Sequence, residues 1–95
     1  MIKCSELKLK GVLLFETEIY EDSRGSFSEV YKESDYFRFL PKDINFIQDN
    51  ESVSQYGVLR GLHFQKKPLE QSKLIRVSKG EIQDVIVDIQ KESDT

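Results

Sequence analysis

The sequence predicts an all-β fold, an antiparallel sandwich or barrel that includes one short helix. Short apolar runs, most of them alternating with polar residues or rich in Val and Ile, are separated by turn-forming residues. Helices and strands do not alternate in the way that builds a parallel sheet. The predicted strands are residues 12–15, 27–31, 45–54, 58–64, 73–77 and 81–89.

The first two strands are separated by a charged loop. Residues 12–15 are apolar, and residues 21–26 form the predicted loop, in which Gly25 is free to adopt a positive φ. In the strand at 27–31 apolar and polar residues alternate, so every second side chain lies on one face. That shared face carries Phe27, Glu29 and Tyr31.

One short helix is predicted after these strands. Ser34 is the predicted N-cap, and Asp35 suits the first turn, where a negative charge is favourable. Pro41 ends the segment because it cannot continue a helix. The apolar residues at helical spacing are Tyr36, Phe37 and Leu40.

The strand at 45–54 has an unusual polar centre. In a pleated strand Gln48 and Asn50 point to one side and Asp49 points to the other. Paired polar side chains suit a wet pocket. A half-exposed edge strand with a solvated face explains the same pattern, and we weight it at about two to one over the pocket.

The stretch from 57 to 89 holds the only histidine of the chain. Strict alternation in the strand at 58–64 places Arg60 and His63 on opposite faces. A bulge at Gly61 would shift the register by one residue and bring both side chains to one side.

Lys73 begins the strand at 73–77, on a face that is otherwise apolar. It is either a snorkelling side chain at the mouth of the strand or a buried functional amine. Residues 66–71 are a predicted loop, and residues 78–80 are predicted to close a hairpin with the strand at 81–89.

Length and charge narrow the class of protein. The 95 residues allow one small domain, and an apolar final strand followed by a short polar end predicts the first part of a larger β-fold. The net charge of -3 argues against nucleic-acid binding by phosphate neutralisation. The sequence shows no apolar leader and no membrane-length run, and Cys4 alone cannot form an internal disulfide. These features predict a soluble cytoplasmic protein with no membrane partner.

The polar residues indicate proton chemistry better than metal chemistry. A lone His and a lone Cys give no pair of metal ligands, and there is no glycine-rich phosphate loop. His63 is suited to act as a base, Lys73 to stabilise a developing oxyanion, and Arg24 or Arg60 to bind a phosphate. A solvated histidine among ordinary cations explains the same residues, and composition alone favours that simpler alternative.

Four segments in this order resemble the dTDP-4-dehydrorhamnose 3,5-epimerase family. They are residues 22–29, residues 46–50, residues 57–65, and residues 71–77 with Gly80, Asp84, Val85 and Asp88. Together they extend over nearly the whole chain, and four ordered motifs are far more specific than any one of them. The resemblance implies an antiparallel jelly-roll sandwich of the cupin class, with residues 1–95 as the N-terminal part of a single domain.

The resemblance also implies an activity. It is the epimerisation of dTDP-4-keto-6-deoxy-glucose at C3 and C5, without cofactor or metal, in dTDP-rhamnose and deoxysugar biosynthesis. A homodimer is implied as well. His63 matches the catalytic base, and Lys73 matches the lysine that stabilises the enolate oxygen. The positions that bind substrate are matched by Arg24, Phe27, Glu29, Gln48, Asp49, Asn50 and Arg60.

The chain departs from the family in three respects. Ser26 stands where an aromatic residue is common, and Gln90 stands where an arginine is frequent. The family chain is roughly twice as long, and its second half carries the tyrosine acid and the acidic residue that orients the catalytic histidine. No tyrosine of this chain matches that acid, so we expect the chain by itself to be poorly folded, oligomeric or inactive.

Two alternatives stay open at this point. One is a related epimerase that acts at C3 or C5 alone, an outcome that depends on how long the enolate is held. The other is a truncated, non-catalytic protein that binds nucleotide-sugars. A metal-dependent cupin is disfavoured because the chain has one histidine.

Overall fold

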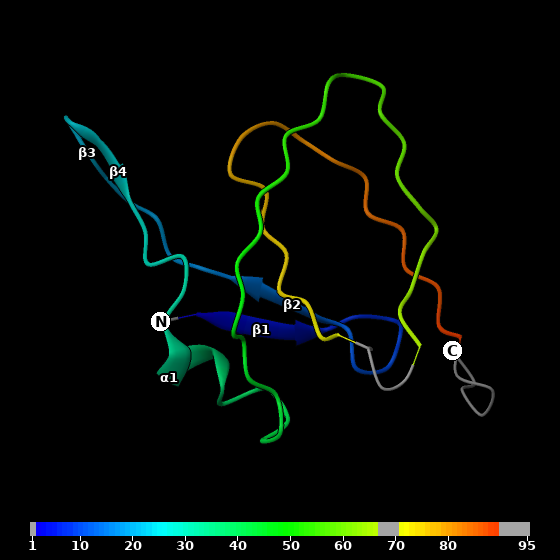
Figure 1. Ribbon diagram of the computed structural model, residues 1–95. Coiled ribbons are helices and arrows are strands. Elements are labelled where there is room, and N and C mark those ends of the chain that lie inside the picture. Colours follow the sequence, from blue (N-terminus) through cyan, green and yellow to red (C-terminus); the bar gives the residue numbers. More distant parts are fainter. Residues whose placement is uncertain (1, 67–70, 90–95) are drawn as a thin grey trace. The chain divides into compact units, whose positions relative to one another are not determined.

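The computed structural model describes residues 2–66 and 71–89 (Figure 1). The chain forms two compact units. The first consists of Met1–Lys42 with Gln83–Thr95, and the second is Asp43–Ile82. Part of the predicted loop at 66–71, and the position of Gln90, lie outside the described residues.

The first unit begins with a two-stranded antiparallel sheet. Strand β1 (Lys3–Glu6) pairs with strand β2 (Leu13–Glu16), and Cys4 lies opposite Phe15. The strand predicted at 12–15 is confirmed with a shift of one residue. Strand β1 was not predicted, because a short segment with little apolar alternation has no strand signal of its own and depends on its partner.

A tight hairpin follows, formed by β3 (Tyr20–Asp22) and β4 (Gly25–Phe27). The predicted loop at 21–26 and the predicted strand at 27–31 are therefore wrong in their bounds, because the turn is shorter and the strand ends at Phe27. The reason is local. Asp22 accepts a hydrogen bond from the backbone N–H of Arg24 (2.8 Å), and Gly25 takes a φ of 137° that suits glycine.

The predicted helix is present as α1 (Glu33–Tyr36). Its N-cap is Lys32, in an extended conformation and without a side-chain cap, so the prediction of Ser34 as N-cap is wrong. The carbonyl of Lys32 accepts the first backbone hydrogen bonds, from Asp35 (3.1 Å) and Tyr36 (3.2 Å). The start of the helix is set by the burial of Tyr36 and not by a cap.

Ile2 and Tyr36 are the buried apolar residues among the described part of the chain, and Tyr36 lies in a cluster of aromatic rings. Tyr36 is 4% exposed, and its ring centroid lies 4.6 Å from that of Phe15 and 5.2 Å from that of Tyr31. The Phe15 ring also lies 6.1 Å from Phe39. The Tyr36 hydroxyl donates to the carbonyl of Val30 (2.8 Å), so its polar end is satisfied. This cluster attaches α1 and its flanking segments to β2.

The described residues of the second unit contain no helix or strand. The strands predicted at 45–54, 58–64 and 73–77 are therefore not formed, and neither is the strand predicted at 81–89. The physical reason is that a strand needs a neighbour to complete its ladder of hydrogen bonds, and these segments have none among the described residues.

The turns of the second unit are present without the strands that they were predicted to join. The chain turns at Tyr56-Gly57, where the N–H of Val58 donates to the carbonyl of Gln55 (3.3 Å). It bends again over residues 78–80, the predicted hairpin turn. The predicted bulge at Gly61 is absent among the described residues, because no ladder forms there for a bulge to interrupt.

Apolar side chains of the second unit remain exposed. Ile47 is 87% exposed, Leu59 is 92% exposed, and Leu62 is 76% exposed. The antiparallel strands and the short helix of the first unit are thus the part of the predicted all-β fold that the structure contains. No helix among the described residues is long and apolar enough to cross a membrane.

We predict that Tyr36→Phe weakens the first unit. The change removes the only polar atom of the Tyr36 side chain and leaves the Val30 carbonyl without that donor. Amide hydrogen exchange, followed by NMR, should show protection in β1 and β2 falling about two- to tenfold, as expected for one lost hydrogen bond. Tyr56→Phe, at a fully exposed tyrosine, is the matched control and should leave protection unchanged.

We predict that the 95-residue chain self-associates in solution. Exposed apolar side chains and unpaired backbone in the second unit favour contact between copies. Sedimentation velocity over a dilution series should show a sedimentation coefficient that rises with protein concentration. A monodisperse monomer that unfolds cooperatively would contradict this prediction.

Candidate functional site

Arg24 occupies the tip of the β3–β4 hairpin. Its side chain is 88% exposed, and its Nη2 and Nε donate to Oδ2 of Asp22 at 2.7 Å and 3.3 Å. The Arg24 guanidinium, followed by the backbone N–H groups of the turn, lowers the pKa of the Asp22 carboxyl below its ordinary value. The hairpin thus holds a cation in one place at the surface.

A shallow hollow of about 270 Å³ lies along this hairpin. The sequence-predicted residues Arg24 and Phe27 both line it, together with Ser26, the residue that departs from the family pattern. At the base of the hairpin the Ser28 hydroxyl donates to the hydroxyl of Thr17 (3.2 Å), which joins the two segments that enter and leave it. The structure therefore brings together a cation and an aromatic ring beside one open space.

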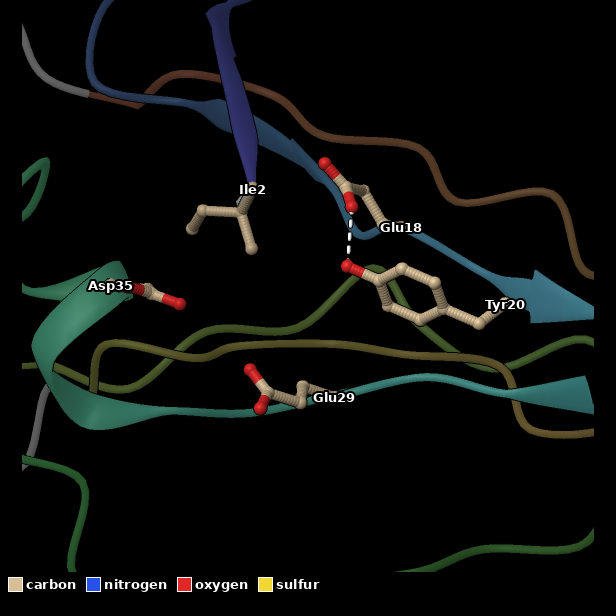
Figure 2. A pocket seen from close by; sticks show the side chains of 5 residues that line it. All are labelled: Ile2, Glu18, Tyr20, Glu29 and Asp35. Atoms are coloured by element: carbon tan, nitrogen blue, oxygen red, sulfur yellow. Dashed lines mark hydrogen bonds between the residues drawn. The ribbon is translucent and has the colours of Figure 1, made fainter.

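A second pocket of the first unit contains Glu29, the third predicted site residue of this unit (Figure 2). Figure 2 shows its carboxylate near those of Glu18 and Asp35. The pocket that these residues line has a volume of about 20 Å³, which is room for a single water. The Tyr20 hydroxyl donates to Oε2 of Glu18 (2.5 Å). This bond raises the pKa of Tyr20 and lowers that of Glu18.

Sequence reasoning did not select Glu18, Tyr20 or Asp35. The available signal was weak: Glu16, Glu18 and Tyr20 recur at period two, which is as typical of a solvated strand face as of a site. Because the pocket gathers carboxylates, it disfavours an anionic ligand. An anion is better accommodated at the Arg24 tip.

In the second unit, Gln48 donates through Nε2 to Oδ1 of Asn50 (3.1 Å). This contact agrees with the prediction that the two side chains point to one side. Gln48, Asp49 and Asn50 are all exposed, so the described residues do not enclose a wet pocket around them. Their exposure agrees with the alternative interpretation, in which these polar side chains face solvent.

Arg60 donates through Nε and Nη2 to Oγ of Ser54, at 3.2 Å and 3.1 Å, and is held by one hydroxyl. His63 is exposed, and its Nδ1 lies 3.5 Å from the point that a Cβ on Gly61 would occupy, so the ring lies close to the Gly61 backbone. Lys73 is also exposed. The interpretation of Lys73 as a buried amine is therefore wrong for this structure.

Neither His63 nor Lys73 forms a hydrogen bond or ion pair with another described residue. Both are chemically competent groups without a described partner to orient them. They share the second unit with Gln48, Asp49, Asn50 and Arg60, and the first unit holds Arg24, Phe27 and Glu29. Among the described residues no group of three or more His, Cys, Asp or Glu side chains is placed to hold a metal ion.

Comparison with known proteins identifies the class. A protein-family model described as dTDP-4-dehydrorhamnose 3,5-epimerase matches residues 6–95. The match includes every sequence-predicted site residue, from Arg24 to Lys73. The chain therefore belongs to the dTDP-4-dehydrorhamnose 3,5-epimerase family.

Curated relatives carry the same description. The protein from Methanothermobacter thermautotrophicus is 52% identical over 88 residues, which cover 92% of this chain and 46% of the relative. The protein from Shigella flexneri is 43% identical over 88 residues, covering 93% and 49% of the two chains. The protein from Pseudomonas aeruginosa is 40% identical over 94 residues, covering 99% and 51%. The chain spans about half the length of these relatives. No solved structure matches it.

We predict that Asp22 titrates below an ordinary aspartate because Arg24 stabilises its charged form. The lowered folded-state pKa means that the contribution of this contact is complete above the unfolded pKa and is lost as pH falls through the folded pKa. A ¹³C NMR titration of the carboxyl should give this lowered midpoint. Arg24→Gln should raise it toward the ordinary value, whereas Arg38→Gln, at an arginine that lies over Phe39, should not.

Proposed function

We propose that this chain supplies the N-terminal part of the active site of a nucleotide-sugar epimerase. The reaction is the cofactor-free epimerisation of dTDP-4-keto-6-deoxy-glucose at C3 and C5. The observation that carries the proposal is the family match over residues 6–95, which includes His63 and Lys73 within their motifs. The description of the relatives as dTDP-4-dehydrorhamnose 3,5-epimerases supports the choice of a dTDP-sugar substrate.

The chemistry follows from the 4-keto group, which acidifies the C–H bonds on both sides of it. His63 takes the proton, the electron pair of the broken C–H bond moves to the keto oxygen, and the Lys73 ammonium stabilises the resulting enolate. Return of a proton to the opposite face inverts the carbon. The resemblance assigns that return to a tyrosine in the half of the family sequence that this chain does not match.

We assign the substrate contacts to the polar and aromatic residues that match the family's binding positions. We assign the diphosphate to Arg24 or Arg60, since arginine binds phosphate in a bidentate manner. The exposed guanidinium of Arg24 and the hollow that it shares with Phe27 support this assignment. The remaining contacts are assigned to Glu29, Gln48, Asp49 and Asn50.

We extend the proposal to the complete fold and the oligomeric state. We assign residues 1–95 to the first part of a single cupin-type jelly roll that works as a homodimer in the cytoplasm. The exposed apolar segments of the second unit support this assignment. Ile47 and Leu59 lie in segments whose sequence pattern is typical of strands. Their side chains would be buried once those strands are paired.

Two alternatives differ in chemistry. An epimerase that acts at C3 or C5 alone would use the same base and the same lysine. A non-catalytic protein that binds nucleotide-sugars would need Arg24 and the amides but no oriented base. One observation favours the second alternative: no described residue holds His63 in a single tautomer.

We predict that the chain exchanges substrate protons with solvent. Incubation of dTDP-4-keto-6-deoxy-glucose with the chain in D₂O should place deuterium at C3 and C5, as followed by NMR. His63→Ala should abolish exchange, and Lys73→Ala should slow it about 10²- to 10³-fold because the enolate loses its cation. Lys79→Ala, at an exposed lysine of the bend over residues 78–80, is the matched control and should leave the rate unchanged.

The pattern of labelling separates the alternatives. Deuterium at one carbon alone supports the single-carbon epimerase. Binding of dTDP without exchange at either carbon supports the non-catalytic protein and contradicts catalysis by this chain alone. Exchange that survives His63→Ala would contradict the assignment of the base.

A further inference from the structure

The Arg24 guanidinium is occupied on one edge and open on the other. Arginine carries five N–H donors in a planar fork. Oδ2 of Asp22 accepts from Nε and Nη2, which is the side edge of the group. Nη1 makes no hydrogen bond with any described residue, so the end edge formed by Nη1 and Nη2 is available to a ligand. The exposed fraction of the side chain, 88%, agrees with this.

Asp22 is itself fixed to the backbone of the turn. Its Oδ1 accepts the backbone N–H of Arg24 (2.8 Å), and the residue pairs with Gly25 across the hairpin. One carboxylate therefore holds both the backbone and the head group of the same arginine. This arrangement removes rotamer freedom from a long side chain that is otherwise fully solvated.

We propose that Asp22 is a positioning residue that holds the Arg24 guanidinium so that its Nη1–Nη2 edge faces the diphosphate of the nucleotide-sugar. The inference rests on the proposed function, which assigns Arg24 to the substrate. An arginine that is already ordered binds an oxyanion without first losing its rotamer freedom, and the end edge matches two phosphate oxygens.

The sign of the effect on affinity distinguishes positioning from charge. By Coulomb's law alone, the negative charge of Asp22 weakens the binding of an anion, so removing it should strengthen binding. A positioning role has the opposite sign, because removing the carboxylate frees the arginine. Glu21, which lies opposite Ser26 in the same hairpin, carries the same charge without a described bond to Arg24 and is the matched control.

The experiment is a titration with dTDP at low ionic strength, followed by calorimetry. Asp22→Asn keeps an oxygen that can accept the backbone N–H of the turn but removes the charge-assisted bonds to the guanidinium. It should raise the Kd about three- to tenfold. Glu21→Gln should leave the Kd unchanged or lower it. In an Arg24→Gln background, Asp22→Asn should produce no further rise, because the residue acts through Arg24.

Three results would overturn the proposal. They are a Kd for Asp22→Asn equal to or below that of the wild type, a rise of equal size in the Arg24→Gln background, and no binding of dTDP by the wild-type chain. The second result would indicate damage to the hairpin and not loss of positioning. Affinity and deuterium exchange are separate measurements. The expected order of Kd values without exchange would contradict catalysis by this chain alone and support the role of Asp22.

Discussion

The packing of Tyr36 against Phe15 is the contact on which the first unit depends. It joins α1 to β2, and the rings of Tyr31 and Phe39 extend it on either side. A tyrosine can be buried at this point because its hydroxyl has an acceptor, the carbonyl of Val30. Without that acceptor, burial would leave an unsatisfied polar group, and the four-residue helix has too few backbone bonds to form without packing.

In the second unit, the described segments have no neighbouring strand with which to pair. Its segments have the apolar content of strands, yet their backbones are not paired and their large side chains are exposed among the described residues. The hydrophobic effect favours burial of these side chains, but a strand can bury them only within a sheet that satisfies its N–H and C=O groups. In the proposed jelly roll, those groups would be paired and the side chains would face a core.

Electrostatics divides the first unit into two regions. The carboxylates of Glu18, Glu29 and Asp35 surround one small pocket, whereas Arg24 stands at the tip of the hairpin. Tyr20 lines both the acidic pocket and the hairpin hollow. An anion is disfavoured in the first region, and Arg24 is the cation that could bind one in the second. Because these groups are exposed, the effect weakens as salt is added.

The sequence by itself determined the family, the candidate residues and the positions of the turns. Gly25, Gly57 and Gly80 adopt positive φ values in or next to turns, as a residue without a Cβ allows, and the strand near residue 13 follows from its apolar run. The hydrogen bond between Gln48 and Asn50 follows from the period of an extended chain. These features depend on residues close together in the sequence.

Only the tertiary structure decided which segments pair, where α1 begins, and which site residues are exposed. Strand β1 forms because it pairs with β2. The position of α1, which begins at Glu33, is determined by the packing of Tyr36 against Phe15. The segments at 58–64 and 73–77 have equally good strand patterns but no described partner, so His63 and Lys73 remain in solvent. The pairing of a strand is a property of two segments, and the pattern of one segment does not contain it.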